Sequence, residues 1–139
     1  MNDLQNDAVQ LNGLIENFAM TVAGVEHALV FSVDGLPIAR STRLETDAAE
    51  RLSTVAAAVI GLAEGSTEGT GVGAVQEVMI VMEHRYLFVT RVGHGGALAV
   101  VTTPSADVDL IGYEMGLLVD RSGTLLTPEL RNLMLAQTS

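Results

Sequence analysis

The chain has 139 residues, of which 17 are acidic and 7 basic, so its net charge is −10 with neutral histidines. It contains no cysteine, and every basic residue is an arginine, which excludes disulfides, thiolate metal sites, Walker-A phosphate loops and Schiff-base lysines. An acidic chain without a basic stripe is also a poor ligand for nucleic acid or for an anionic membrane surface. The length suits one domain that buries its own core.

The sequence carries no sign of export or membrane insertion. Its first residues, MNDLQND, are polar and acidic, unlike a secretory signal. No apolar run approaches the roughly 18 residues of a membrane span, and the longest strongly apolar stretch covers residues 55–63. We therefore expect a soluble cytoplasmic domain without direct membrane insertion, which could reach a membrane only through its partners.

The chain opens with a predicted amphipathic helix over residues 3–23. Apolar residues recur there at spacings of three, four and seven, which places them on one face of a helix. These residues are Leu4, Leu11, Leu14, Ile15, Phe18 and Val22. Gly24 follows as a helix stop signal.

A predicted β-hairpin comes next. Residues 25–33 are rich in β-branched and apolar side chains, and Asp34-Gly35 is a two-residue turn typical of antiparallel strands. The chain returns over residues 36–40. Because Pro37 has no N–H to donate to a ladder, we expect this second strand at an edge of the sheet.

The second predicted helix spans residues 46–64, with Asp47 and Glu50 at capping-box spacing. Its sequence, AAERLSTVAAAVIGLAEG, is apolar or small nearly all round. Such a helix must be covered on more than one face. In a chain this short, we expect the second cover to be another molecule.

Three strands in antiparallel succession should follow the glycine-rich loop at residues 65–73, because the connections between them are too short for a parallel crossover. A third helix and a short final helix beginning at Thr127-Pro128-Glu129 complete the chain. The strands are predicted at residues 74–83, 86–92 and 97–103, and the third helix at residues 107–120. The fold class is therefore α+β, in the order α-β-β-α-β-β-β-α plus a C-terminal helix, with one five-stranded antiparallel sheet between helices.

This order, together with two sequence segments, resembles the roadblock/dynein light chain family and its profilin-like sandwich. The first segment is GVEHALV, residues 24–30, which leads into DGLPIA, residues 34–39. The second is the Ala-rich helix followed by the strand pair at residues 78–92. The later sequence IGYEMGLLVDRSGTLLTPELR is similar to one branch, the roadblock proteins of actinobacterial conservons. We expect a roadblock domain over residues 4–120 and a C-terminal extension over residues 121–139.

The resemblance implies a homodimer in which the second helices pack antiparallel and the third strands pair edge to edge. The two-sided apolar character of the second helix is what such an isologous contact needs, and pairing would remove an exposed strand edge. The interface predicted on this basis consists of Leu52, Val55, Ala56, Val59, Ile60, Ala63, Met79 and Val81.

The resemblance also implies the partners. Conservon neighbours encode a Ras-like small GTPase and a histidine-kinase-like sensor protein, and bacterial roadblock relatives regulate GTPases by reshaping the switch region. The expected function is therefore a non-enzymatic regulatory or scaffold protein that modulates the nucleotide cycle or the location of such a GTPase. Two alternatives remain open: a structural adaptor with no nucleotide-dependent effect, and a GTPase-activating protein that uses an arginine.

No motif predicts a catalytic residue, a cofactor or a metal. The glycines at positions 69, 71 and 73 form GxGxG after a helix, the reverse of the dinucleotide-binding order, and are expected to be a flexible connection rather than a phosphate cradle. The histidines at positions 27, 84 and 94 have no metal-binding spacing, and no GxSxG elbow occurs.

Arginines at positions 40, 43 and 51 cluster around the second strand and the start of the second helix. They could supply an arginine finger for a GTPase. The favoured interpretation is surface ion pairing with Glu45, Asp47 or Glu50.

Overall fold

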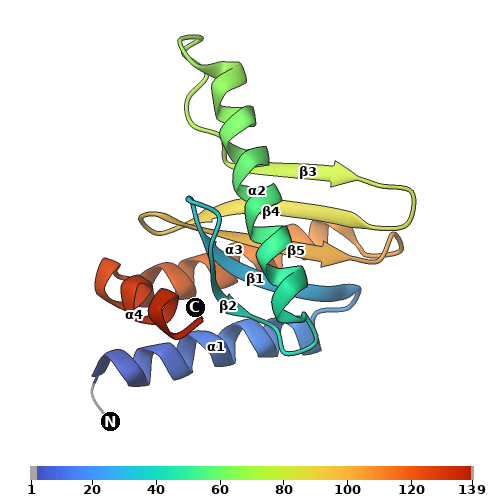
Figure 1. The fold of residues 1–139 in the computed structure, drawn as a ribbon. Coiled ribbons are helices and arrows are strands. Elements are labelled where there is room, and N and C mark those ends of the chain that lie inside the picture. The colour runs from blue at the N-terminus through green and yellow to red at the C-terminus, as the bar shows by residue number, and fades with distance from the viewer. Residues whose placement is uncertain (1–2, 139) are drawn as a thin grey trace.

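The computed structural model describes residues 3–138 as one five-stranded antiparallel sheet with helices on both faces (Figure 1). The elements follow the expected order. They are α1 (Asp3–Thr21), β1 (Val25–Ser32), β2 (Pro37–Arg40), α2 (Thr46–Thr67), β3 (Glu77–Val81), β4 (Tyr86–Val92), β5 (Gly96–Thr102), α3 (Val108–Leu125) and α4 (Pro128–Thr138). None of the helices in this part of the chain is long and apolar enough to cross a membrane.

The strands lie in the order β2-β1-β5-β4-β3, so β2 and β3 are the two edges. The edge position expected for the strand that contains Pro37 is confirmed. Strands β1 and β5 form the centre, with Leu29 opposite Ala99 and Val30 opposite Leu98. Most residues of these strands are buried because helices cover both of their faces.

Successive side chains of each strand point to opposite faces of the sheet, so the interior consists of two apolar clusters. One face of the sheet packs against α1, α3 and α4, with Leu11, Phe88 and Met115 among its buried residues. The other packs against α2 alone, with Phe31 and Ile60 among its members. The α2 cluster is the smaller one, because a single helix crosses that whole face (Figure 1).

The starts of α2 and α3 differ. Asp107 caps α3, and its carboxylate accepts hydrogen bonds from the backbone N–H groups of Asp109 and Leu110. The capping box predicted from Asp47 and Glu50 is wrong, because the N-cap of α2 lies two residues earlier, at Glu45, whose side chain makes no capping bond. Of these two helices, only α3 therefore has N-terminal N–H groups satisfied by a capping side chain.

The C-terminal residues are part of the body of the domain. Helix α3 continues beyond the predicted end at residue 120 to Leu125, and α4 buries Leu130 and Met134 in the α1 and α3 cluster. The hairpin between β4 and β5 packs closely under this segment. Gly95 has a φ of +78°, a backbone conformation that favours glycine, and a Cβ there would stand 2.1 Å from Nη1 of Arg131 and displace that guanidinium.

Candidate interaction surfaces

Helix α2 has an inward face and an outward face of different composition. Its buried residues, Ala49, Ser53, Ala56 and Ile60, recur at spacings of four, three and four and lie against the sheet. The outward stripe runs through Arg51, Val55, Ala58, Leu62 and Gly65, all of them exposed. Val55 is 53% exposed and Leu62 76% exposed, although aliphatic side chains of this size are usually buried.

Two of the predicted interface residues belong to the interior of the chain itself. Ala56 is fully buried and Ile60 is 2% exposed, both in the α2 cluster, so neither side chain can meet a second molecule without opening the core. The sequence pattern placed them on the interface because α2 is apolar on both faces. Which face meets the chain's own sheet is decided by tertiary packing.

The remaining predicted helix residues keep different degrees of exposure. Val55 is outward, whereas Leu52, Val59 and Ala63 are half-buried along the flanks of the helix. The sequence interpretation missed Leu62, the most exposed aliphatic residue of α2. Its spacing of seven residues from Val55, two full helical turns, was a signal that could have found it.

Helix α2 is longer than the sheet is wide. With 22 residues it extends about 33 Å, whereas five strands span about 19 Å from edge to edge. The helix starts over β2, crosses every strand and ends beyond β3 (Figure 1). No side chain after Ile60 in α2 is buried, so the last seven residues, 61–67, form an overhang without a core beneath it.

Strand β3 ends the sheet beneath this overhang. Val78 and Ile80 point toward α2 and pack against its cluster. Met79 and Val81 lie on the opposite face and are 39% and 67% exposed. Strand β3 pairs with β4 on one side, and within residues 3–138 no strand pairs with its other side. A strand edge bordered by exposed apolar residues is a site where another chain can add a strand.

The arginine cluster is not paired with carboxylates. The ion pairs formed within residues 3–138 use Glu26, Glu64 and Glu83 as their acids, so the ion pairing expected for the three arginines is wrong. Arg43 and Arg51 are exposed. The half-buried Arg40 instead donates hydrogen bonds to the carbonyl oxygen of Leu44 and to Oγ1 of Thr46.

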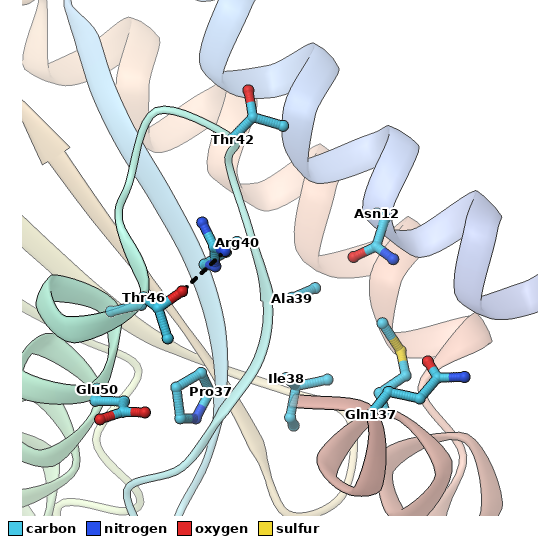
Figure 2. Close-up of a pocket in the computed structure, with 11 residues that line it drawn as sticks. Asn12, Pro37, Ile38, Ala39, Arg40, Thr42, Thr46, Glu50 and Gln137 are labelled. Carbon is cyan, nitrogen blue, oxygen red and sulfur yellow. Dashed lines mark hydrogen bonds between the residues drawn. The ribbon is translucent and has the colours of Figure 1, made fainter. Parts of the chain in front are cut away.

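Arg40 borders a cavity of about 510 Å³ along the β2 edge (Figure 2). The wall of the cavity combines the four residues of β2 with side chains from α1, α2 and α4, including Asn12, Glu50 and Gln137. One terminal nitrogen of the Arg40 guanidinium binds Leu44 in the β2–α2 loop, and the other binds Thr46, the first residue of α2. This geometry makes Arg40 a brace for the loop and a poor candidate for an inserted arginine finger.

The glycine loop between α2 and β3 is open around its three positive-φ glycines. Gly69, Gly71 and Gly73 have positive φ angles and open space around the position of a Cβ, so they form turns rather than a close cradle. In the described part of the chain, no three His, Asp or Glu side chains lie together as a metal site would require. His84 lies on the surface, 3.5 Å from the carboxylate of Glu83.

Residues 11–102 match the family model of the Roadblock/LC7 domain. A Roadblock/LC7 domain from Streptomyces avermitilis is 35% identical over 81% of this chain and 97% of its own, with a TM-score of 0.67. MglB from Myxococcus xanthus has a TM-score of 0.76 at 13% identity, covering 84% of this chain and 94% of its own. Profilin IB from Acanthamoeba castellanii has a TM-score of 0.60 at 14% identity, over 82% of this chain and 97% of its own. No curated protein matches the chain in sequence.

Proposed function

Because this chain belongs to the Roadblock/LC7 family, we propose that it is a non-enzymatic regulatory module that forms a homodimer and binds a Ras-like small GTPase. The fold it shares with MglB and the similarity to a Streptomyces domain agree with a bacterial roadblock protein of the conservon type. In that setting a histidine-kinase-like sensor is a second partner.

The observation that supports the homodimer is the outward stripe of α2 above a bare β3 edge. Val55 and Leu62 would bury their exposed apolar surface against the same residues of a second copy, as an isologous contact requires. The exposed small residues Ala58, Gly61 and Gly65 allow two helices to approach closely. Two β3 edges would pair at the same time, which places Met79 and Val81 beside their counterparts.

Regulation of the GTPase would follow from differential affinity. A partner that binds the GDP and GTP forms equally shifts no equilibrium, however tightly it binds. The proposed module therefore prefers one switch conformation and stabilises it. An adaptor without regulatory effect would bind both forms alike.

The test combines a pull-down with a measurement of self-association. The wild-type chain is used to capture proteins from lysate of its own cells, once with GDP and once with a non-hydrolysable GTP analogue. Retention of a small GTPase in one nucleotide state is the expected result. Retention in both states alike would support the adaptor, and capture of no GTPase would overturn the proposed partner.

Sedimentation then tests the dimer. The Leu62→Asp variant places a carboxylate on the outward stripe without touching the core, and we expect it to be monomeric and folded. Val9→Asp is the matched control, because Val9 is 62% exposed on α1, away from the proposed contact. If Leu62→Asp remains as dimeric as Val9→Asp, the outward stripe is not the dimer surface.

A further inference from the structure

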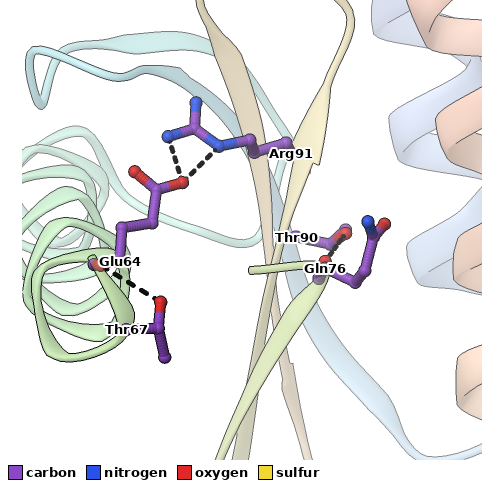
Figure 3. Close-up of polar contacts among 5 residues, drawn as sticks. All are labelled: Glu64, Thr67, Gln76, Thr90 and Arg91. Carbon is purple, nitrogen blue, oxygen red and sulfur yellow. Dashed lines mark hydrogen bonds and ion pairs between the residues drawn. The ribbon is translucent and has the colours of Figure 1, made fainter. Parts of the chain in front are cut away.

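The overhang of α2 is joined to the sheet by one pair of charged side chains (Figure 3). Arg91, near the end of β4, donates from Nε to Oε1 of Glu64 over 2.7 Å, and one of its terminal nitrogens donates to the same oxygen. The other side-chain hydrogen bonds of residues 61–67 are made by Ser66 and Thr67 to carbonyl oxygens of the helix itself. Neither apolar cluster includes a residue of this segment.

The loop that follows α2 does little to hold the overhang. Residues 69–73 contain three glycines with positive φ angles and open space around each. Between this loop and the last turns of α2 lies a half-open hollow of about 740 Å³, which Glu64 and Arg91 both line. The ion pair is thus the contact best placed to fix the direction of the helix end.

The position of Glu64 in the helix also fixes which side faces outward. Glu64 follows Leu62 by two residues, a rotation of about 200° around the helix axis, so the two side chains point in nearly opposite directions. When Arg91 holds Glu64 toward the sheet, Leu62 must face away from it. The 76% exposure of Leu62 and the 33% exposure of the Glu64 side chain agree with this arrangement.

We infer that Arg91 is a positioning residue for self-association: through Glu64 it sets the tilt and rotation of residues 61–67, so that Leu62 meets a second copy of this chain. The inference rests on the proposed homodimer. The pair between Glu64 and Arg91 forms within one chain, and its effect is measured as the affinity between two chains. Arg91 itself need not touch the partner.

Sedimentation equilibrium measures the dimer dissociation constant of the wild type, Arg91→Ala, Glu64→Gln and the charge-swapped double variant Glu64→Arg with Arg91→Glu. We expect a roughly three- to fivefold weaker dimer for each single variant, the scale of one partly exposed ion pair, and recovery in the double variant. Arg85→Ala is the matched control. It removes the same charge and breaks the pair between Arg85 and Glu26 in the β3–β4 turn, at the opposite end of β4 from Arg91, so it should leave the constant unchanged.

Amide hydrogen exchange distinguishes positioning from direct contact. At a concentration where the chain is monomeric, exchange in residues 61–67 should rise in Arg91→Ala and not in Arg85→Ala. A weaker dimer with unchanged exchange would overturn the positioning role in favour of a contact across the interface. Equal dissociation constants for Arg91→Ala and Arg85→Ala would overturn the inference and leave the dimer intact. A wild type that stays monomeric would overturn the proposed dimer and, with it, this inference.

Discussion

The two edges of the sheet are finished in different ways. At the β2 edge, Pro37 lies in a four-residue strand, α1 and α4 pack alongside, and Arg40 braces the loop into α2. At the β3 edge, the strand itself exposes Met79 and Val81, and α2 extends past it without a core beneath.

The difference favours β3 over β2 as the edge that would pair in the proposed homodimer. Proline, a short strand and flanking helices discourage strand addition, whereas a regular strand with apolar neighbours favours it. The position of α2 explains this difference in part. The helix starts at the β2 edge and is longer than the sheet is wide. The surplus length appears entirely at the β3 end.

The largest expected effect is a loss of stability at Ile60, the last residue of α2 that is buried against the sheet. Ile60→Asp buries a carboxylate in the α2 cluster and should lower the free energy of unfolding by about 4 kcal/mol, enough to unfold much of the chain. Leu62→Asp, two residues later, should unfold at nearly the wild-type denaturant concentration when both chains are diluted until the wild type is monomeric. Chemical denaturation followed by circular dichroism measures both. Equal losses in the two variants would place the end of the supported segment beyond residue 62.

The β3 edge can be blocked without harming the sheet. Met82 donates its backbone N–H to Arg85, and bonded pairs alternate in an antiparallel ladder, so the N–H of Met79 points away from β4. Met79→Pro removes this outward donor together with the exposed Met79 side chain, and it leaves the ladder bonds to β4 intact. We expect the dimer dissociation constant, measured by sedimentation, to rise at least about tenfold, which corresponds to about 1.4 kcal/mol.

Ile80→Pro is the contrasting variant at the same edge. Ile80 pairs with Leu87, and its N–H faces β4, so proline there breaks a ladder bond within the chain. At a dilution where the wild type is also monomeric, its thermal midpoint should fall, whereas that of Met79→Pro should change little. An unaltered dimer in Met79→Pro would show that the β3 edges do not pair.

At the β2 edge, Arg40→Ala tests the brace. Loss of the bonds to Leu44 and Thr46 should lower the free energy of unfolding by about 1–2 kcal/mol, because a charged donor is removed from two acceptors in a half-buried loop. The dimer constant should stay at the wild-type value. A weaker dimer with unchanged stability would mean that the β2 end takes part in self-association.

The smallest effect concerns the uncapped start of α2. Glu45 has the extended backbone of an N-cap residue but no side-chain capping bond, and the shorter carboxylate of Glu45→Asp could reach the N–H groups of the first turn. We expect a gain of about 0.5–1 kcal/mol in denaturant unfolding. Asp107→Ala, which removes the cap that α3 does have, should lose a similar amount. A loss on Glu45→Asp would mean that the backbone at Thr46 cannot accept a capping side chain.

Much of the fold follows from local signals. Helical spacing from Leu11 to Phe18 identified the buried face of α1, and the Asp34-Gly35 turn and Pro37 predicted the hairpin and its edge strand. Strand β4 was predicted to its last residue. These signals work because each depends on residues close together in the chain.

Contacts between distant residues were less predictable. The favoured pairing of Arg40, Arg43 and Arg51 with nearby acids follows from sequence proximity, but carbonyl and hydroxyl groups of the loop hold Arg40 instead. The pair between Glu64 and Arg91 joins residues 27 positions apart, and no local pattern marks it.

By itself, the sequence determined the class of fold, the order of its elements and the presence of a helix with more apolar surface than one sheet can cover. Periodicity encodes those properties, and periodicity is local. The tertiary structure decided which face of α2 packs against the sheet. From the sequence alone, Ala56 and Ile60 could equally have faced a partner, but both are buried in the α2 cluster. It also decided that the last seven residues of α2 overhang, since the width of a sheet depends on how many strands pair and in what order.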